Sequence, residues 1–130
     1  MAAIRGKDTK PELALRLALR QAGATGYRVH RRDLPGRPDI AFIRWKVAVF
    51  VDGVFWHGHP EHWNPREASS DYWRQKISRN IERDRDADTA LAELGWRVIR
   101  VWDTDVRDRP GECVQQVIRA LREAGKPLDA

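Results

Sequence analysis

The chain of 130 residues suits one compact domain with one hydrophobic core, which we place over residues 1–125. It carries 24 Lys and Arg against 19 Asp and Glu, a formal net charge of +5 that favours a polyanionic partner, although a basic surface without that role is the alternative. A single cysteine excludes a disulfide framework and a cysteine-based zinc site and fits a reducing cytoplasm, and no segment resembles a membrane span or a signal peptide.

The first predicted helix begins at a capping box. Thr9 stands at the N-cap position and Glu12 three residues later, which predicts a helix from there to about Gly23. The apolar residues expected to face inward are Leu13, Leu17 and Ala18.

Three strands are predicted next. Tyr27–Arg32 has the pattern of a strand, and two prolines and a glycine then make Leu34–Pro38 a turn. Asp39–Ile43 and Val47–Val51 form an antiparallel hairpin around the connection Arg44–Lys46. The second of these two strands is almost wholly apolar, which indicates a central strand buried on both faces.

The hairpin register places one carboxylate at the open end of the sheet. If Ile43 lies opposite Val47, then Asp39 lies opposite Val51. A charge beside a buried strand is costly unless it binds something, although a turn aspartate after a proline explains Asp39 equally well. Side-chain alternation predicts that Asp52 lies on the other face of the sheet.

The second half of the chain alternates helices and a strand. After an aromatic loop at Gly53–Pro65, a long helix is expected from Asp71 to Leu94, stopped by Gly95. A strand at Trp96–Trp102, a turn at Pro110 and Gly111, and a helix at Glu112–Glu123 follow, with a disordered tail at 126–130. This order predicts an α/β fold with a mixed central sheet flanked by helices.

Asp84 interrupts the apolar stripe of the long helix, one turn after Asn80. The helical period places Asp84 among the residues expected to face inward, which are Trp73, Ile77, Ile81, Leu91 and Leu94. A buried carboxylate needs a partner. The alternatives are a salt bridge to one of the many arginines and a hydrogen bond to the imidazole of His57.

Four ordered motifs resemble the very short patch repair (Vsr) endonucleases, bacterial mismatch nickases with a restriction-endonuclease-like fold. The motifs are Pro35–Asp39, Val51–His59, Tyr72–Asp84 and Leu94–Trp102. The resemblance runs from about Met1 to Arg122 and implies a three-layer domain that nicks one DNA strand beside a mismatched T·G pair and leaves a 5′-phosphate. It also implies a bacterial, nucleoid-associated protein.

The resemblance implies roles for individual residues. Asp39 binds Mg²⁺ together with the backbone carbonyl of Val51, His57 is the general base that activates water, and Asp84 orients His57. Glu12 matches a glutamate near the metal-bound waters, and a supporting catalytic role follows for Asp52. The residues implied to wedge into or bind DNA are Phe55, Trp56, Trp73, Arg37 and Asn80.

Two departures from the family pattern matter. Where the family has cysteines of a structural zinc site, this chain has Val54 and Thr104. His59 and His62 do not by themselves make a specific zinc pattern, so we predict that structural zinc is absent. The chain also begins at a methionine that usually lies inside the family sequence, after a segment that approaches DNA.

The sequence therefore predicts a Mg²⁺-dependent endonuclease, acting as a monomer on double-stranded, mismatched or distorted DNA, with possible recruitment by mismatch-repair proteins. One alternative is an enzyme of the same fold that cuts another DNA structure or both strands. The other is a DNA-binding module without catalysis. The presence of Asp39, His57 and Asp84 argues against this last alternative, because binding alone requires none of them.

Overall fold

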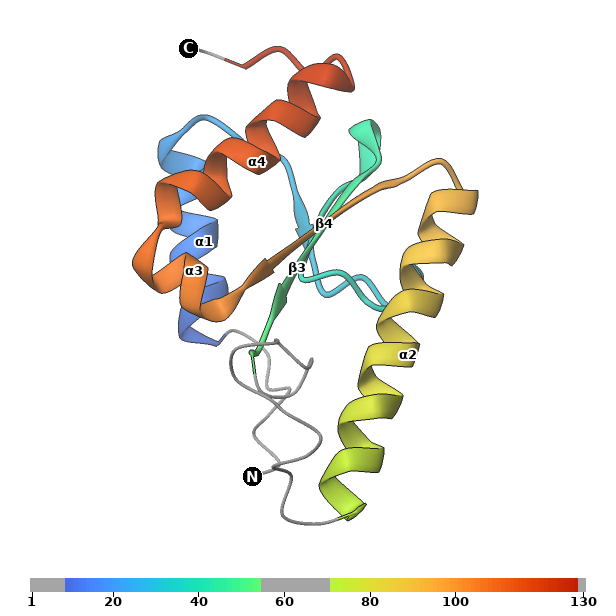
Figure 1. The fold of residues 1–130 in the computed structure, drawn as a ribbon. Coiled ribbons are helices and arrows are strands. Elements are labelled where there is room, and N and C mark those ends of the chain that lie inside the picture. The colour runs from blue at the N-terminus through green and yellow to red at the C-terminus, as the bar shows by residue number, and fades with distance from the viewer. Residues whose placement is uncertain (1–8, 55–70, 129–130) are drawn as a thin grey trace.

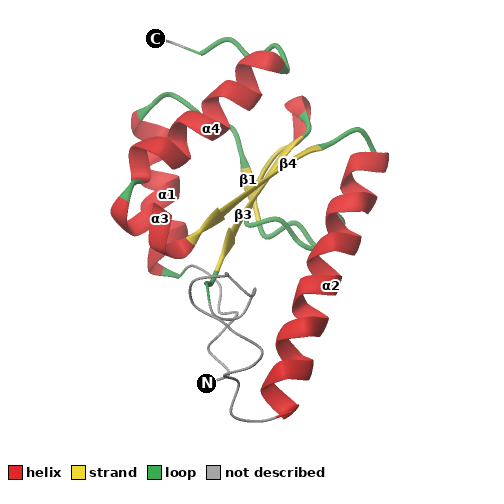
Figure 2. Ribbon diagram, in the orientation of Figure 1, coloured by secondary structure: helices red, strands yellow, loops and turns green. Residues whose placement is uncertain are grey.

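The computed structural model describes residues 9–54 and 71–128 as a mixed sheet with helices on both faces (Figure 1). The helices α1, α3 and α4 cover one face and α2 covers the other (Figures 1 and 2). This architecture confirms the predicted α/β class. In chain order the elements are α1 (Lys10–Gln21), β1 (Arg28–Val29), β2 (Ile40–Phe42), η2 (Ile43–Trp45), β3 (Val47–Asp52), α2 (Asp71–Glu93), β4 (Arg97–Trp102), α3 (Asp103–Asp108) and α4 (Pro110–Glu123).

The four strands lie in the order β1-β2-β3-β4. The pairs β1–β2 and β2–β3 are antiparallel and β3–β4 is parallel, so β3 lies inside the sheet. The predicted hairpin is present, but the predicted register is wrong by one residue, because Phe42 and not Ile43 pairs with Val47. The cause is the 3-10 turn η2, which ends on Lys46 in a left-handed conformation at φ 54° and lengthens the connection.

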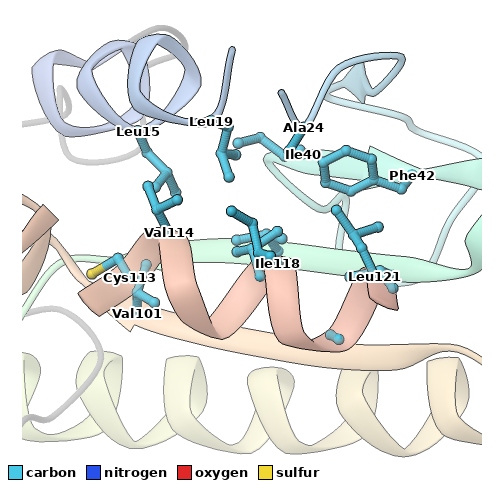
Figure 3. Packing of buried hydrophobic residues seen from close by; sticks show 14 of the residues in the cluster. Leu15, Leu19, Ala24, Ile40, Phe42, Val101, Cys113, Val114, Ile118 and Leu121 are labelled. Carbon is cyan, nitrogen blue, oxygen red and sulfur yellow. The ribbon is translucent and has the colours of Figure 1, made fainter. Parts of the chain in front are cut away.

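The main hydrophobic core lies between the sheet and the helices α1, α3 and α4. Figure 3 shows the leucines of α1 pointing toward the apolar side chains of α4, with Ile40 and Phe42 of β2 beside them. A smaller cluster joins the other face of the sheet to α2 through Ala48, Phe50 and Leu91. This second cluster gives α2 a much smaller apolar interface than the opposite layer has.

Helix α1 buries a different face from the predicted one. Leu13 and Leu17, expected inside, are 49% and 58% exposed, whereas Leu15 and Leu19 are fully buried. The N-cap is confirmed, because the Thr9 hydroxyl accepts a hydrogen bond from the backbone N–H of Glu12 at 3.4 Å. The observed rotation of the helix also carries the Glu12 side chain inside, where it is 5% exposed.

The second half of the chain follows the prediction with three local differences. Helix α2 is present and Gly95, at φ 86°, follows its end as predicted, but Leu94 is 53% exposed and not part of the inward stripe. Pro110 lies in the first turn of α4 and not in a turn before it, a position that suits a residue without an N–H. The short helix α3 was not predicted.

Candidate active site

Asp39 is buried at the point where the chain enters β2. Its side chain is held beside β3, because the backbone N–H of Val51 donates a hydrogen bond of 2.7 Å to one carboxylate oxygen. Asp39 is 7% exposed and the preceding Pro38 is fully buried. The proline-rich turn therefore delivers a carboxylate to the end of β3. The predicted strand register, which set Asp39 opposite Val51, is wrong by one residue, but the two residues meet through this hydrogen bond.

Three potential metal ligands meet at this point. Glu12 of α1, His30 after β1 and Asp39 before β2 place ligand atoms within 4.8 Å of one another. The imidazole Nε2 of His30 lies 3.4 Å from Glu12 Oε2, and the Arg16 guanidinium lies 3.3 Å from the same oxygen and 3.1 Å from the imidazole. Two carboxylates and an imidazole thus share one largely enclosed space.

Their chemistry fits a divalent cation. Carboxylate oxygens are the ligands that hard cations such as Mg²⁺ prefer, and an imidazole extends the set toward transition metals. Two buried carboxylates close together repel each other unless a positive charge lies between or beside them. Glu12 and Asp39 are both more than nine-tenths buried; the Arg16 guanidinium lies beside Glu12, and a cation between the two carboxylates would offset the repulsion that remains.

The sequence analysis missed His30. Nothing in the local sequence distinguishes this histidine, which stands among arginines. Its placement follows from the antiparallel pairing of β1 with β2, in which Val29 lies opposite Ile40, so that His30, which follows Val29, comes toward Asp39, which precedes Ile40. His30 also has a left-handed backbone at φ 52°, which re-aims its side chain relative to a regular strand.

A second charged cluster surrounds Arg100 of β4. Its guanidinium donates two hydrogen bonds of 3.0 Å to the Asp52 carboxylate at the end of β3. On the α2 side it bonds the carboxylate of Asp88 at 2.8 to 3.1 Å and lies 3.7 Å from an oxygen of Asp84. One arginine therefore connects two strands with α2.

The arginine partner predicted as one alternative for Asp84 is therefore present. The other predicted partner, His57, lies outside the described residues, as do Phe55 and Trp56. Burial would lower the pKa of Arg100, but Asp88, Asp52 and Asp84 more than offset it and raise the pKa. The guanidinium therefore keeps its charge, as arginine does in proteins generally.

The two clusters flank the same strand end. Val51 contacts Asp39 through its backbone, and the next residue, Asp52, contacts Arg100 through its side chain. Phe50 and Leu91 belong to the apolar cluster on the α2 face, whereas Val51 packs on the opposite core. The sequence analysis predicted that Asp52 lies on the face of the sheet opposite Asp39; in the structure Asp39 lies beside Glu12 of α1, whereas Asp52 bonds Arg100, which in turn bonds Asp88 of α2.

A surface hollow of about 660 Å³ lies between the turn before Asp39 and α2. Its lining includes Arg37, Asn80, Arg83 and Asp84. Two predicted DNA contacts, Arg37 and Asn80, are thus brought together with a carboxylate predicted to be catalytic. Arg83 is a further cation that lines this hollow. Trp73, at the start of α2, packs edge-on against Tyr72 with ring centroids 5.0 Å apart.

Within residues 9–54 and 71–128, no helix has the length and apolar character needed to cross a membrane.

Comparisons with known proteins indicate the family to which this chain is similar. The family described as DNA mismatch endonuclease Vsr matches residues 1–64. The chain is 42% identical over 123 residues to the type II nicking enzyme V.NmeDIP of Neisseria meningitidis serogroup C, covering 92% of this chain and 81% of that relative. It is 44% identical to the type II nicking enzyme V.XorIIP of Xanthomonas oryzae pv. oryzae, covering 83% and 79%. It is 39% identical to the DNA mismatch endonuclease Vsr of Escherichia coli, covering 84% and 70%.

Proposed function

The chain belongs to the family of Vsr DNA mismatch endonucleases, and from this premise we propose that it nicks one DNA strand beside a T·G mismatch in a Mg²⁺-dependent reaction. The observation that carries the proposal is the buried group Glu12, His30 and Asp39 beside the end of β3. A binding module has no need for two buried carboxylates, whereas hydrolysis of a phosphodiester has a use for the cation that they attract.

We assign the metal to Asp39, with Glu12, His30 and the carbonyl of Val51 as the neighbouring donors. In an extended strand the N–H and C=O of one residue point to the same side, and the Val51 N–H already points at Asp39. When bound, the cation would stabilise the negative charge that develops on the scissile phosphate.

The protein residues supply the proton transfer and the binding of DNA. In this proposal His57 takes the proton of the attacking water, and Asp84 holds the imidazole in the required orientation. Arg37, Arg83 and Asn80, which line one hollow, bind phosphate oxygens. Phe55, Trp56 and Trp73 wedge between bases beside the mismatch, where stacking is weakest.

The test is nicking of labelled duplexes in Mg²⁺. We expect the wild-type protein to nick one strand of a T·G duplex, leaving a 5′-phosphate, and to leave the matched duplex intact. Asp39→Ala should lose nicking while keeping affinity for the duplex, because phosphate and stacking contacts elsewhere carry that affinity. The control is Asp33→Ala, an exposed aspartate of the same segment that pairs only locally with Arg31 at 2.7 Å, which should nick normally.

Other outcomes identify the alternatives. Cleavage of both strands, or of matched and branched DNA, would identify a nuclease of another specificity. Tight binding of mismatched DNA without any cleavage would identify a binding module. We further propose that the enzyme is a monomer in the bacterial cytoplasm, recruited by mismatch-repair proteins. Sedimentation of the protein with and without DNA tests the monomer directly.

A further inference from the structure

The side chain of Arg100 forms hydrogen bonds to both β3 and α2. Its Nη1 donates to both oxygens of Asp52, and its Nε and Nη2 donate to Asp88. Nη2 also approaches the backbone carbonyl of Asp84 at 3.4 Å, and Nη1 lies 3.7 Å from that residue's carboxylate. Both the side chain and the helix backbone at position 84 are therefore held by one guanidinium.

The guanidinium itself has little freedom. It lies over the ring of Phe50 at 4.0 Å from the centroid, and its side chain is 20% exposed. Stacking on an aromatic ring fixes the plane of the guanidinium, and the fork of donors then fixes the directions of its hydrogen bonds. The carboxylates that receive those bonds are consequently fixed relative to β3 and β4.

This contact lies beyond the apolar cluster that joins the later turns of α2 to the sheet. The buried residues Ala87 and Leu91 hold the later turns of the helix, and Leu91 packs with Phe50 and Trp96. Asp84 lies one turn before Ala87 and is 25% exposed, at the border of the hollow that also contains Arg37 and Asn80. Ile77, further toward the start of α2, is buried but does not belong to this apolar cluster.

We propose that Arg100 is a positioning residue for strand nicking, which holds the Asp84 carboxylate at a fixed place beside the end of β3. The inference rests on the proposed function, in which Asp84 orients the general base. Asp52 anchors the arginine on the β3 side and Asp88 anchors it on the α2 side. Arg100 does not touch the reacting atoms; it acts through Asp84.

The structure also explains why a lysine cannot replace this arginine. An ammonium carries the charge, but it presents no planar fork that can bond carboxylates of two elements at once. Arg100→Lys should therefore retain most of the stability that the charge provides and lose the geometry. Arg100→Gln should lose both, because Asp52, which is 4% exposed, then stays buried without its cation.

The first experiment measures kcat and KM for nicking of a T·G duplex, well below the melting temperature of each variant. We expect Arg100→Lys and Arg100→Gln to lower kcat by about 10- to 100-fold, the usual loss for a partner that orients a functional group, with a much smaller change in KM. The matched control is Arg97→Gln, because Arg97 is an exposed arginine of the same strand that pairs with Glu123 of α4. Its kcat should equal that of the wild type.

The second experiment is a double-mutant cycle with Asp84→Asn. If Arg100 acts through Asp84, adding Arg100→Lys to Asp84→Asn should cost less than about threefold more, whereas independent residues multiply their losses. A purely structural arginine would give multiplicative losses. The Arg97→Gln control combined with Asp84→Asn should show no coupling.

The outcomes separate the inference from the proposed function. Three results would each overturn the positioning role even though the wild-type protein nicks DNA. These are a wild-type kcat in Arg100→Lys and Arg100→Gln, multiplicative losses in the cycle, and full activity of Asp84→Asn. If Arg100→Gln does not fold, the cycle with Arg100→Lys decides. A wild-type protein that nicks no duplex would refute the proposed function, and the inference with it.

Discussion

Replacing Gly36 by alanine should destabilise the contact between α2 and the turn that leads to Asp39. Gly36 has φ +75°, a backbone conformation that residues with a side chain rarely adopt. A Cβ there would lie 2.7 Å from the Cβ of Ala87 on α2 and 3.2 and 3.3 Å from two ring carbons of Phe50. Cβ atoms do not approach one another that closely, so either the turn or the helix must move.

The expected loss has two parts. The left-handed conformation costs an L-residue about 1–2 kcal/mol. Inserting a methyl group into a filled contact costs about 1–3 kcal/mol more, so the free energy of unfolding should fall by about 2–5 kcal/mol. Because the same turn leads directly into Asp39 and carries Arg37, the nicking rate of the variant should fall as well.

Urea unfolding followed by tryptophan fluorescence measures the loss. Gly26→Ala is the matched control, because Gly26 has φ +83° but a Cβ there meets no atom within 4 Å; it should lose only the conformational part, about 1–2 kcal/mol. Adding Ala87→Gly to Gly36→Ala should recover part of the steric loss, although the glycine itself costs a helix about 1 kcal/mol. Equal losses for Gly26→Ala and Gly36→Ala, with no recovery in the double variant, would refute the close contact.

Three further predictions concern the core, the cysteine and the general base. Leu19→Ala should lower the free energy of unfolding by about 2–5 kcal/mol because Leu19 is fully buried. Leu17→Ala, at an exposed position, should change it by less than about 0.5 kcal/mol. The reverse order of the two losses would support the helix face predicted from the sequence. Burial, with Asp105 and Glu112 nearby, raises the pKa of the Cys113 thiol, so alkylation of the native protein should be slow. The stability contributed by the neutral thiol should be present below the ordinary thiol pKa and be lost as the pH rises through the raised value. If the native protein were alkylated at pH 8 as fast as the protein in urea, the raised pKa of Cys113 would be contradicted. His57→Ala combined with Asp84→Asn should lose much less nicking activity than the product of the two single losses, and a multiplicative loss would separate the two residues.

Helix α1 shows which part of a helix a sequence can predict. Its start depends on local chemistry, the Thr9 cap, and was predicted correctly. Its buried face was not, because leucines stand at 13, 15, 17 and 19, and both the predicted and the observed face carry two of them. Packing against α4 decides between the faces, and this long-range contact also brings Glu12 inside.

The two charged clusters show a similar division. Asp84 was identifiable because a carboxylate at an inward-facing position of an amphipathic helix requires a partner. Its partner was not identifiable, because the chain has many arginines and Arg100 lies 16 residues away on another element. His30 reaches Asp39 only through the pairing of β1 with β2, which a two-residue strand signals weakly.

The last prediction is that the protein folds without zinc. The resemblance to the family placed zinc-binding cysteines at the positions of Val54 and Thr104. In this chain the Asp103 carboxylate connects the same two residues, because one of its oxygens accepts hydrogen bonds from the backbone N–H of Val54 at 3.3 Å and of Thr104 at 2.7 Å. The only cysteine, Cys113, is buried in the core on α4 and belongs to no group of potential metal ligands among the described residues.

A carboxylate that accepts two backbone hydrogen bonds provides a link between the end of β3 and the start of α3 without a metal. Two such bonds should contribute about 1–3 kcal/mol, far less than a structural zinc site contributes to folding. Asp103→Ala should therefore lower the melting temperature by several degrees, whereas Asp108→Ala on the same helix, which pairs only with its exposed neighbour Arg107, should leave it unchanged. A strong chelator should have no effect on either variant or on the wild type. Stoichiometric zinc after purification, with a large drop in melting temperature on chelation, would show that a zinc site is present. Asp103 would then have a lesser role, because a tetrahedral zinc would make the same connection more strongly.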